Sequence, residues 1–223
     1  MPRALIIGGS VGGLAASLLL RRVGWDVTVF ERSAEDLASR GVGIGLTDAL
    51  LDVLQGIGIP LDALGGITMR SRLWLDRSGA IRAEIPIDTI VTSWSRLYRA
   101  LKAALPLECY HAGTPAVRVE RQPAPVTAVF ADGSKETGDL LVAADGILST
   151  VRRQFLPEAM PRYAGYVTWR GVVDEAEAPP EIRTLLSDRL TFCCPEGELL
   201  LAMPNPSSEG NAERRYYFVW YRP

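Results

Sequence analysis

The sequence predicts an α/β fold in which a domain built on a parallel sheet is interleaved along the chain with an antiparallel sheet. Residues 5–31 read as a strand, a glycine turn, a helix and a second strand. Residues 73–82 read as a hairpin, which is typical of antiparallel sheets. The two domains are expected to alternate in four segments, which are residues 1–66 (parallel), 67–91 (antiparallel), 92–159 (parallel) and 160–223 (antiparallel).

The composition is that of a globular protein with a large core, because 48% of the 223 residues are hydrophobic. The net charge of −2 and the absence of a basic run argue against a nucleic-acid partner. No apolar segment reaches the roughly 18 residues that cross a membrane, so we expect no membrane partner. Because residues 1–3 lead directly into the first strand, we expect no signal peptide and a cytoplasmic protein. A homodimer is left open.

Neither the cysteines nor the histidine form a recognisable catalytic or metal-binding pattern. The three cysteines are an odd number and contain no Cys-x-x-Cys motif, so we expect them to pack. The single histidine, His111, lies in an expected strand at residues 107–111 and gives no basis for a metal cluster or a Ser-His-Asp triad. We therefore expect no metal, and the sequence identifies no catalytic residue.

The first turn carries the strongest functional signal. The apolar run at residues 5–7 is typical of a buried parallel strand, and the glycines that follow allow a ligand to approach the backbone closely. A helix is expected from Gly12 to Arg22, so its N-terminal amides face the turn. Glu31 ends the next strand, where a carboxylate can bind an adenosine ribose while the pyrophosphate rests on the helix N-terminus. This pattern predicts a Rossmann-like dinucleotide site with the candidate residues Gly8, Ser10, Val11, Gly13, Glu31 and Arg32.

Ser10 is the one departure from this pattern. It occupies the place of the second glycine, which normally lies nearest the pyrophosphate. Its small side chain could fit there or donate a hydrogen bond to a phosphate. The strand before the turn, the helix after it and the acid at the end of the second strand favour a dinucleotide site over a simple loop.

The next segment, residues 40–46, has glycine at every second position from 41 to 45. Such a density of glycine indicates either a close backbone approach or a flexible connection. We take Gly43 as a candidate contact of the cofactor, with the flexible connection as the alternative. Thr47 and Ser93 are expected to cap the two following helices, of which the second ends before Pro106.

A second acidic turn follows another expected buried strand. The apolar run at residues 140–144 ends at Asp145-Gly146 and is followed by a short helix. A carboxylate at the carboxyl end of a strand lies where open α/β sheets bind ligands. Asp145, Gly146 and Arg152 are therefore candidate cofactor contacts, and an ordinary turn is the alternative.

Residues 163–170 and 216–221 are rich in aromatic side chains that alternate with the period of a strand. Such stripes usually belong to a core, which is the default for each of these residues. Arg170 is the exception, because an arginine among aromatic residues needs a polar or anionic partner. Arg170 and Trp220 are the candidates for binding a substrate.

Taken together, these features resemble the flavoprotein aromatic hydroxylases, the family of para-hydroxybenzoate hydroxylase. The resemblance covers the whole chain and is strongest toward the branch of the 2,6-dihydroxypyridine hydroxylases. It is carried by the glycine turn with Glu31, the glycine loop, Asp145-Gly146 with Ser149 and Arg152, and most specifically residues 8–10, 92–94 and 163–171.

The resemblance implies FAD as the bound cofactor, with its ADP half on the glycine turn, and NADH or NADPH as a transient reductant. It implies a monooxygenase that uses O2 to hydroxylate a small aromatic or N-heteroaromatic substrate, dihydroxypyridine- or phenol-like, through a C4a-hydroperoxyflavin. Two departures stand out. Trp94 occupies the place of an arginine in many relatives, and the family pattern continues past Pro223, so we expect a C-terminally incomplete chain.

Two alternatives remain at this point. A NAD-dependent Rossmann dehydrogenase would use the same first turn, but it would need neither the second Asp-Gly turn nor the interleaved hairpin. A truncated nucleotide-binding fragment without turnover would show all the features described above. A flavin-dependent halogenase would share the fold, but its Trp-x-Trp-x-Ile-Pro signature is not found in the sequence.

Overall fold

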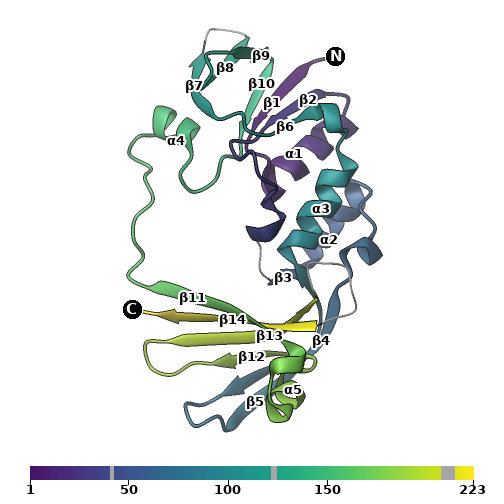
Figure 1. Ribbon diagram of the computed structural model, residues 1–223, viewed down its shortest axis with the longest axis vertical. Coiled ribbons are helices and arrows are strands. Elements are labelled where there is room, and N and C mark those ends of the chain that lie inside the picture. The colour runs from purple at the N-terminus through teal and green to yellow at the C-terminus, as the bar shows by residue number, and fades with distance from the viewer. Residues whose placement is uncertain (41–42, 122–124, 207–213) are drawn as a thin grey trace. The chain divides into compact units, whose positions relative to one another are not determined.

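The computed structural model describes residues 1–40, 43–121, 125–206 and 214–223 (Figure 1). The chain forms two compact units, each of which is assembled from three separate segments. The first unit comprises Met1–Ser39, Leu54–Ile59 and Leu97–Arg162, and the second comprises Arg40–Val53, Pro60–Arg96 and Tyr163–Pro223. The α/β fold with interleaved parallel and antiparallel sheets is confirmed. Residues 40–53 and 60–66, which the sequence assigned to the parallel domain, lie in the second unit.

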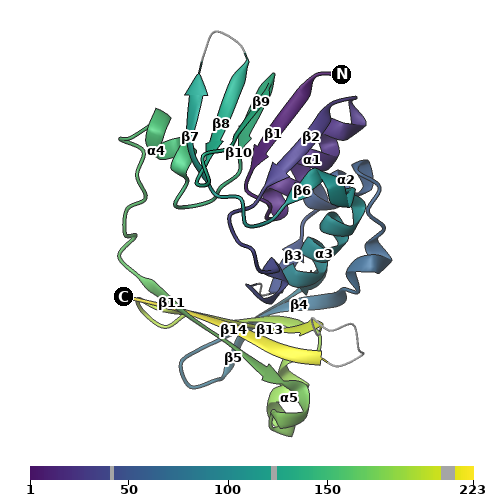
Figure 2. The same cartoon turned by 45° about the horizontal axis from the view of Figure 1, so that its top comes forward.

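The first unit contains a four-stranded parallel sheet and a three-stranded antiparallel sheet (Figures 1 and 2). The parallel sheet has the order β10-β1-β2-β6, with β1 (Arg3–Ile7), β2 (Asp26–Phe30), β6 (Tyr110–His111) and β10 (Leu140–Ala143). The antiparallel sheet is formed in sequence order by β7 (Ala116–Arg121), β8 (Val126–Phe130) and β9 (Lys135–Gly138). The helices associated with this unit are α1 (Val11–Arg22), α3 (Trp94–Ala104), α4 (Thr150–Phe155) and the 3-10 helices η1 (Leu37–Arg40) and η3 (Leu107–Cys109).

The parallel sheet of the first unit packs on both faces. On one face, Leu5 and Ile7 of β1 join Phe130 of β8 in a buried cluster. On the other face, Ile6 lies against Gly13 of α1. Each large side chain buried in this way contributes about 1.5–3 kcal/mol to stability. This two-sided burial explains why β1 is a continuous apolar run rather than an alternating one.

The second unit is built on one seven-stranded sheet with the order β11-β14-β13-β12-β4-β5-β3. Its strands pair antiparallel except for β12 and β4, which run parallel. The strands are β3 (Gly43–Leu46), β4 (Ile67–Leu75), β5 (Ile81–Ser93), β11 (Val167–Asp174), β12 (Arg189–Cys193), β13 (Leu199–Pro206) and β14 (Arg214–Arg222). The associated helices are α2 (Asp48–Gly56), α5 (Pro180–Leu186) and the 3-10 helices η2 (Leu61–Leu64) and η4 (Glu175–Glu177).

Several expected local structures are confirmed by their capping contacts. Ser93 accepts a hydrogen bond from the Arg96 amide at 3.2 Å, so it caps α3 as expected. Asp76 accepts hydrogen bonds from the amides of Ser78 and Ala80 and thereby fixes the β4–β5 hairpin. The expected strand at residues 107–111 is wrong in extent: Pro106 leads into η3, and only the last two residues join the sheet. Helix α5 and strands β12 and β13 were not predicted from the sequence.

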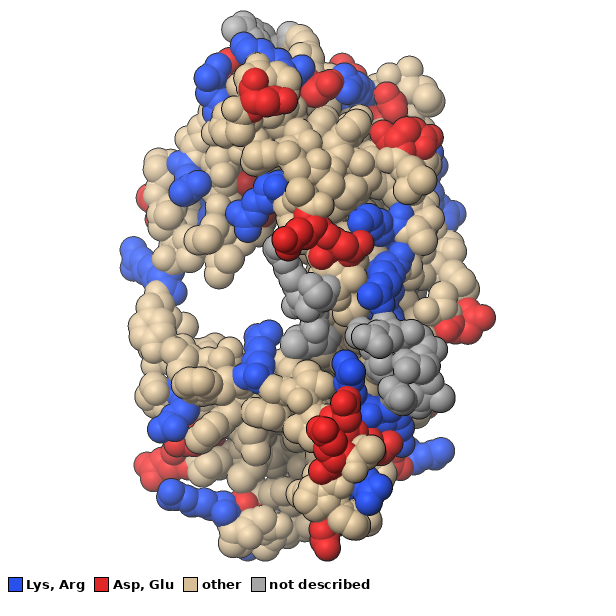
Figure 3. Space-filling model, in the orientation of Figure 1, with Lys and Arg blue, Asp and Glu red and all other residues tan. Residues whose placement is uncertain are grey.

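The surface carries charges of both signs. On the face drawn in Figure 3, acidic and basic side chains are interspersed among uncharged ones. Within the described part of the chain, no helix is both long enough and apolar enough to span a membrane.

Candidate functional site

The glycine turn joins β1 to α1 at the carboxyl end of the parallel sheet. Gly8 has φ +108°, and a Cβ there would collide with the Ala144 backbone of the neighbouring segment after β10. A Cβ on Gly13 would collide with the Gly8 carbonyl oxygen. Both positions therefore require glycine, one for the tight turn and the other for the close packing of helix against turn.

The N-terminus of α1 offers free hydrogen-bond donors next to this turn. Ser10 is the N-cap residue, and its side chain makes no capping hydrogen bond. The Ser10 carbonyl accepts from the Leu14 amide at 2.9 Å, so the amides of Val11, Gly12 and Gly13 precede the first intrahelical bond. No acidic residue lies in the first turn. These groups together favour an anion at the helix N-terminus.

Glu31 is held rigidly at the end of β2. Its side chain is 6% exposed, and its two oxygens accept hydrogen bonds from the Gly9 amide at 2.8 Å and the Ser33 amide at 2.9 Å. Its own backbone is fixed by bonds to His111 and Thr114. A carboxylate can accept about four hydrogen bonds, so Glu31 retains capacity for a ligand hydroxyl. The adjacent Arg32 is exposed.

Asp145 lies next to the glycine turn but is bound to its own helix. One carboxylate oxygen accepts from the Ser149 hydroxyl, and the other accepts from the amides of Thr150 at 2.7 Å and Val151 at 3.3 Å. Arg152 donates to the carbonyls of Gly146 and Ile147. Asp145 and Arg152 therefore hold the loop before α4 in place. Direct contact of these residues or of Gly146 with a cofactor stays a prediction.

The glycine loop falls mostly in the second unit. Gly43 begins β3, pairs with Ser93 of β5, and a Cβ there would lie 2.5 Å from the Met203 side chain. Gly43 is therefore glycine for a packing reason that the sequence did not reveal. Gly41 lies outside the described residues.

The two expected substrate contacts lie on opposite faces of the seven-stranded sheet. Arg170 stands opposite Val219, whereas Trp220 stands opposite Trp169. Because side chains alternate between the faces of a strand, Arg170 and Trp220 cannot line one site on this sheet. The Trp220 indole donates to Glu198 at 2.8 Å, so its polar atom already has a partner.

Tyr217 is a residue on the Arg170 face that the sequence analysis counted only as core. Its side chain is 2% exposed, and its hydroxyl is buried without a hydrogen-bond partner among the described residues. Burial raises the pKa of Tyr217. The charge of the nearby Arg170 guanidinium, and a contact between it and the hydroxyl that does not meet hydrogen-bond geometry, lower the pKa only in part. A buried phenol without a partner beside a cation is a candidate contact for a polar ligand. The period of two places Tyr217 on the face opposite Tyr216, but it could not show that the Tyr217 hydroxyl lacks a partner.

The opposite face of the sheet holds an apolar cavity of about 500 Å³ beneath α5. Its lining includes Ile182 and Leu186 of α5 together with Ala202, Tyr216 and Phe218 of the sheet. Tyr216 donates to Glu175, and burial raises the pKa of Tyr216 to about 12. The cavity has almost no polar lining and no cation, so it is not suited to an ionised substrate.

Comparison with known proteins shows which enzymes this chain resembles. Homologues of this chain are FAD-dependent monooxygenases of aromatic and heteroaromatic compounds. A family model described as FAD binding domain-like matches residues 163–223, which belong to the second unit. The glycine turn lies outside that match.

Individual relatives cover nearly the whole chain. 2,6-Dihydroxypyridine 3-monooxygenase of Paenarthrobacter nicotinovorans is 34% identical over 220 residues, which are 98% of this chain and 55% of that protein. FAD-dependent urate hydroxylase of Klebsiella pneumoniae is 30% identical over 237 residues, covering 99% of this chain and 58% of that one. The chain thus spans about half the length of the curated relatives it matches.

Solved structures agree with these relatives. The structure of 2,6-dihydroxypyridine-3-hydroxylase from Arthrobacter nicotinovorans matches with a TM-score of 0.92 at 34% identity, covering 99% of this chain and 56% of that one. Klebsiella pneumoniae HpxO, complexed with FAD and uric acid, matches with a TM-score of 0.80 at 28% identity, covering 100% of this chain and 57% of that one.

Proposed function

We propose that this chain forms the ADP-binding core and part of the substrate sheet of an FAD-dependent monooxygenase that hydroxylates an electron-rich aromatic ring. The observation that carries the proposal is the glycine turn, where Gly8 and Gly13 admit no side chain and Glu31 is fixed beside them. A NAD-dependent dehydrogenase would use the same turn. The flavin-dependent homologues favour the monooxygenase.

The residues of the first unit fit the ADP part of FAD. The N-terminal amides of α1 and the Ser10 hydroxyl offer donors for a pyrophosphate. Glu31 offers an oriented acceptor for a ribose hydroxyl, and its buried position strengthens such a bond. These residues bind and orient the cofactor. Bound flavin, reduced by NADH or NADPH, supplies the oxygen chemistry that protein side chains cannot.

The substrate proposal rests on the second unit. Arg170 and the unpartnered Tyr217 hydroxyl share one face of the sheet, where a cation and a hydrogen-bond donor can hold an ionised ring hydroxyl. Oxygen transfer of this kind is electrophilic, and an ionised hydroxyl makes the ring electron-rich. We therefore propose a dihydroxypyridine- or phenol-like substrate. Trp220, on the opposite face, is not part of this proposal.

A flavin titration combined with a turnover assay tests the proposed function. The purified protein is titrated with FAD and separately with NAD, and then supplied with NADH or NADPH, O2 and a panel of dihydroxypyridines, hydroxybenzoates and aliphatic ketones. Saturable FAD binding and one oxygen added to a ring hydroxyl compound are expected. Tight binding of NAD without FAD would indicate a dehydrogenase, whereas FAD binding without turnover would indicate a nucleotide-binding fragment.

We further infer a cytoplasmic protein without a nucleic-acid or membrane partner, from its charge of −2 and its apolar pattern. Cell fractionation tests the location. Sedimentation of the purified protein tests whether it forms a homodimer.

A further inference from the structure

Gly9 is a glycine that the dinucleotide pattern does not require. The pattern fixes Gly8 and Gly13 and leaves the position between Gly8 and Ser10 free. Gly9 does not have a positive φ, so its backbone conformation is open to other residues. A Cβ on Gly9 would, however, lie 2.6 Å and 2.7 Å from two ring carbons of Tyr110. The tyrosine therefore occupies the space that a side chain at position 9 would need.

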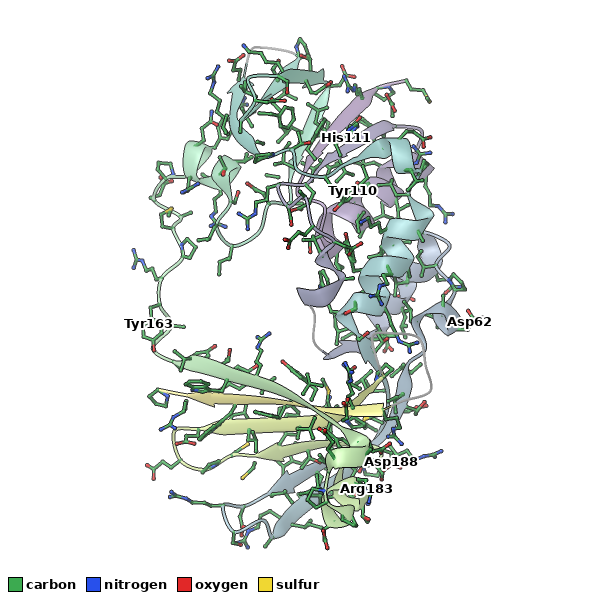
Figure 4. All side chains as sticks on the ribbon, viewed as in Figure 1. Asp62, Tyr110, His111, Tyr163, Arg183 and Asp188 are labelled. Carbon is green, nitrogen blue, oxygen red and sulfur yellow. The ribbon has the colours of Figure 1, made fainter. Side chains whose placement is uncertain are left out.

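Tyr110 is held firmly against the turn. It is labelled in Figure 4 beside His111. It begins β6, and its backbone pairs with Val29 of β2. The Lys102 ammonium lies 4.9 Å from the centre of the Tyr110 ring and is bound to Asp36 at 3.2 Å. Burial raises the pKa of Tyr110 well above its usual range. The phenol thus remains a hydrogen-bond donor across the physiological pH range.

The phenol fixes the direction of a peptide group in the turn. The Tyr110 hydroxyl donates to the Gly9 carbonyl at 3.2 Å, while the Gly9 amide donates to Glu31 at 2.8 Å. In a trans peptide the C=O and the next N–H point in opposite directions. Holding the Gly9 carbonyl toward Tyr110 therefore directs the Ser10 amide away from it, at the start of the helix whose free amides favour an anion.

We propose that Tyr110 is a positioning residue of the dinucleotide site, which orients the Gly9–Ser10 peptide for a nucleotide pyrophosphate, and that Gly9 is glycine in order to admit the phenol. This inference rests on the proposed function, because it assumes that the turn binds a dinucleotide. It assigns a role to a residue 101 positions away from Gly9 in the chain.

A double-mutant cycle on the purified protein tests this proposal, with ADP as the probe because it carries the pyrophosphate without the flavin ring. Tyr110→Phe removes only the hydroxyl and should weaken ADP binding by roughly 2- to 12-fold, the worth of one neutral hydrogen bond. In the protein that retains Tyr110, Gly9→Ala should weaken ADP binding strongly. In the Tyr110→Ala background, the loss of ADP affinity caused by Gly9→Ala should be smaller by a factor of about three or more, because the ring that collides with the added methyl is absent.

Thermal unfolding without ligand is measured for each variant, and Gly12→Ala, whose added methyl meets open space, is the control for folding. Unchanged ADP affinity in Tyr110→Phe, or additive effects of the two substitutions in the cycle, would overturn the positioning role of Tyr110. The proposed function would still stand in that case, provided that the wild type binds ADP. If the wild type binds neither ADP nor FAD, the proposed function itself fails. Should Tyr110→Ala not fold, the Tyr110→Phe affinity alone decides.

Discussion

Two sets of polar side chains, one in each unit, differ in their hydrogen bonding. In the first unit, the Glu31 and Asp145 carboxylates accept hydrogen bonds from backbone amides on more than one oxygen. In the second unit, the buried hydroxyls of Tyr217 and Thr191 have no partner among the described residues. A site whose groups are held before ligand arrives gains affinity by preorganisation, whereas an unpartnered buried group costs stability until something binds it. We therefore expect the Glu31 carboxylate to be rigid before any ligand binds, and the Tyr217 hydroxyl to gain a partner only when a ligand binds.

Disturbing the rigid glycine turn should have the largest effect. Gly13→Ala places a methyl group against the Gly8 carbonyl and should lower the free energy of unfolding by about 3 kcal/mol or more, because backbone on both sides must move. The matched Gly12→Ala should leave stability unchanged or raise it by about 0.4–1 kcal/mol, since its methyl meets open space. Urea unfolding of both variants measures the difference. Equal stabilities would mean that the turn is not rigid.

Glu31 should show the next largest effect. In Glu31→Gln, an NH2 group replaces one of the two carboxylate oxygens and faces a backbone N–H. One charge-assisted hydrogen bond, worth about 1.5–3 kcal/mol, is therefore lost. FAD affinity should fall roughly 10- to 150-fold, as measured by flavin fluorescence titration. An exposed carboxylate of the same unit provides the control, because Glu35→Gln should change affinity by much less. Wild-type affinity in Glu31→Gln would remove Glu31 from the cofactor site.

The second unit offers a test in which stability and function should change in opposite directions. Tyr217→Phe removes a buried hydroxyl without a partner, so the protein should become more stable by about 1 kcal/mol, yet bind its hydroxylated ring substrate less tightly. Thr191→Val removes the other unpartnered hydroxyl, which lines the apolar cavity on the opposite face, and should stabilise without any loss of binding. Calorimetry and substrate titration compare the two. A substrate role for Tyr217 would be contradicted if both variants lost substrate affinity equally, or if neither variant lost any.

The sequence revealed the first region better than the second for a physical reason. The turn, its helix and Glu31 lie within one short segment, so local spacing was enough to predict them. The period of two correctly placed Tyr216, Phe218 and Trp220 on one face. It could not predict that Trp169 pairs with Trp220, because register between strands about fifty residues apart depends on long-range packing. For the same reason the contact of Tyr110 with Gly9 was not foreseen.

The smallest expected effect concerns Tyr216, which does have a partner and so serves as the contrast to Tyr217. Burial and the adjacent Glu175 raise the pKa of Tyr216 from 10.0 to about 12, so the folded state holds this proton more tightly than the unfolded chain does. The resulting stability is fully present below pH 10 and should be lost as the pH rises toward about 12. Tyr216→Phe removes this dependence, whereas Tyr163→Phe, which removes an exposed phenol, should retain it. Urea midpoints at pH 9 and about pH 11 measure the difference. If the wild type and Tyr216→Phe lose stability equally over this interval, the phenol of Tyr216 is not held by Glu175, and the contrast between the partnered and unpartnered tyrosines of β14 would disappear.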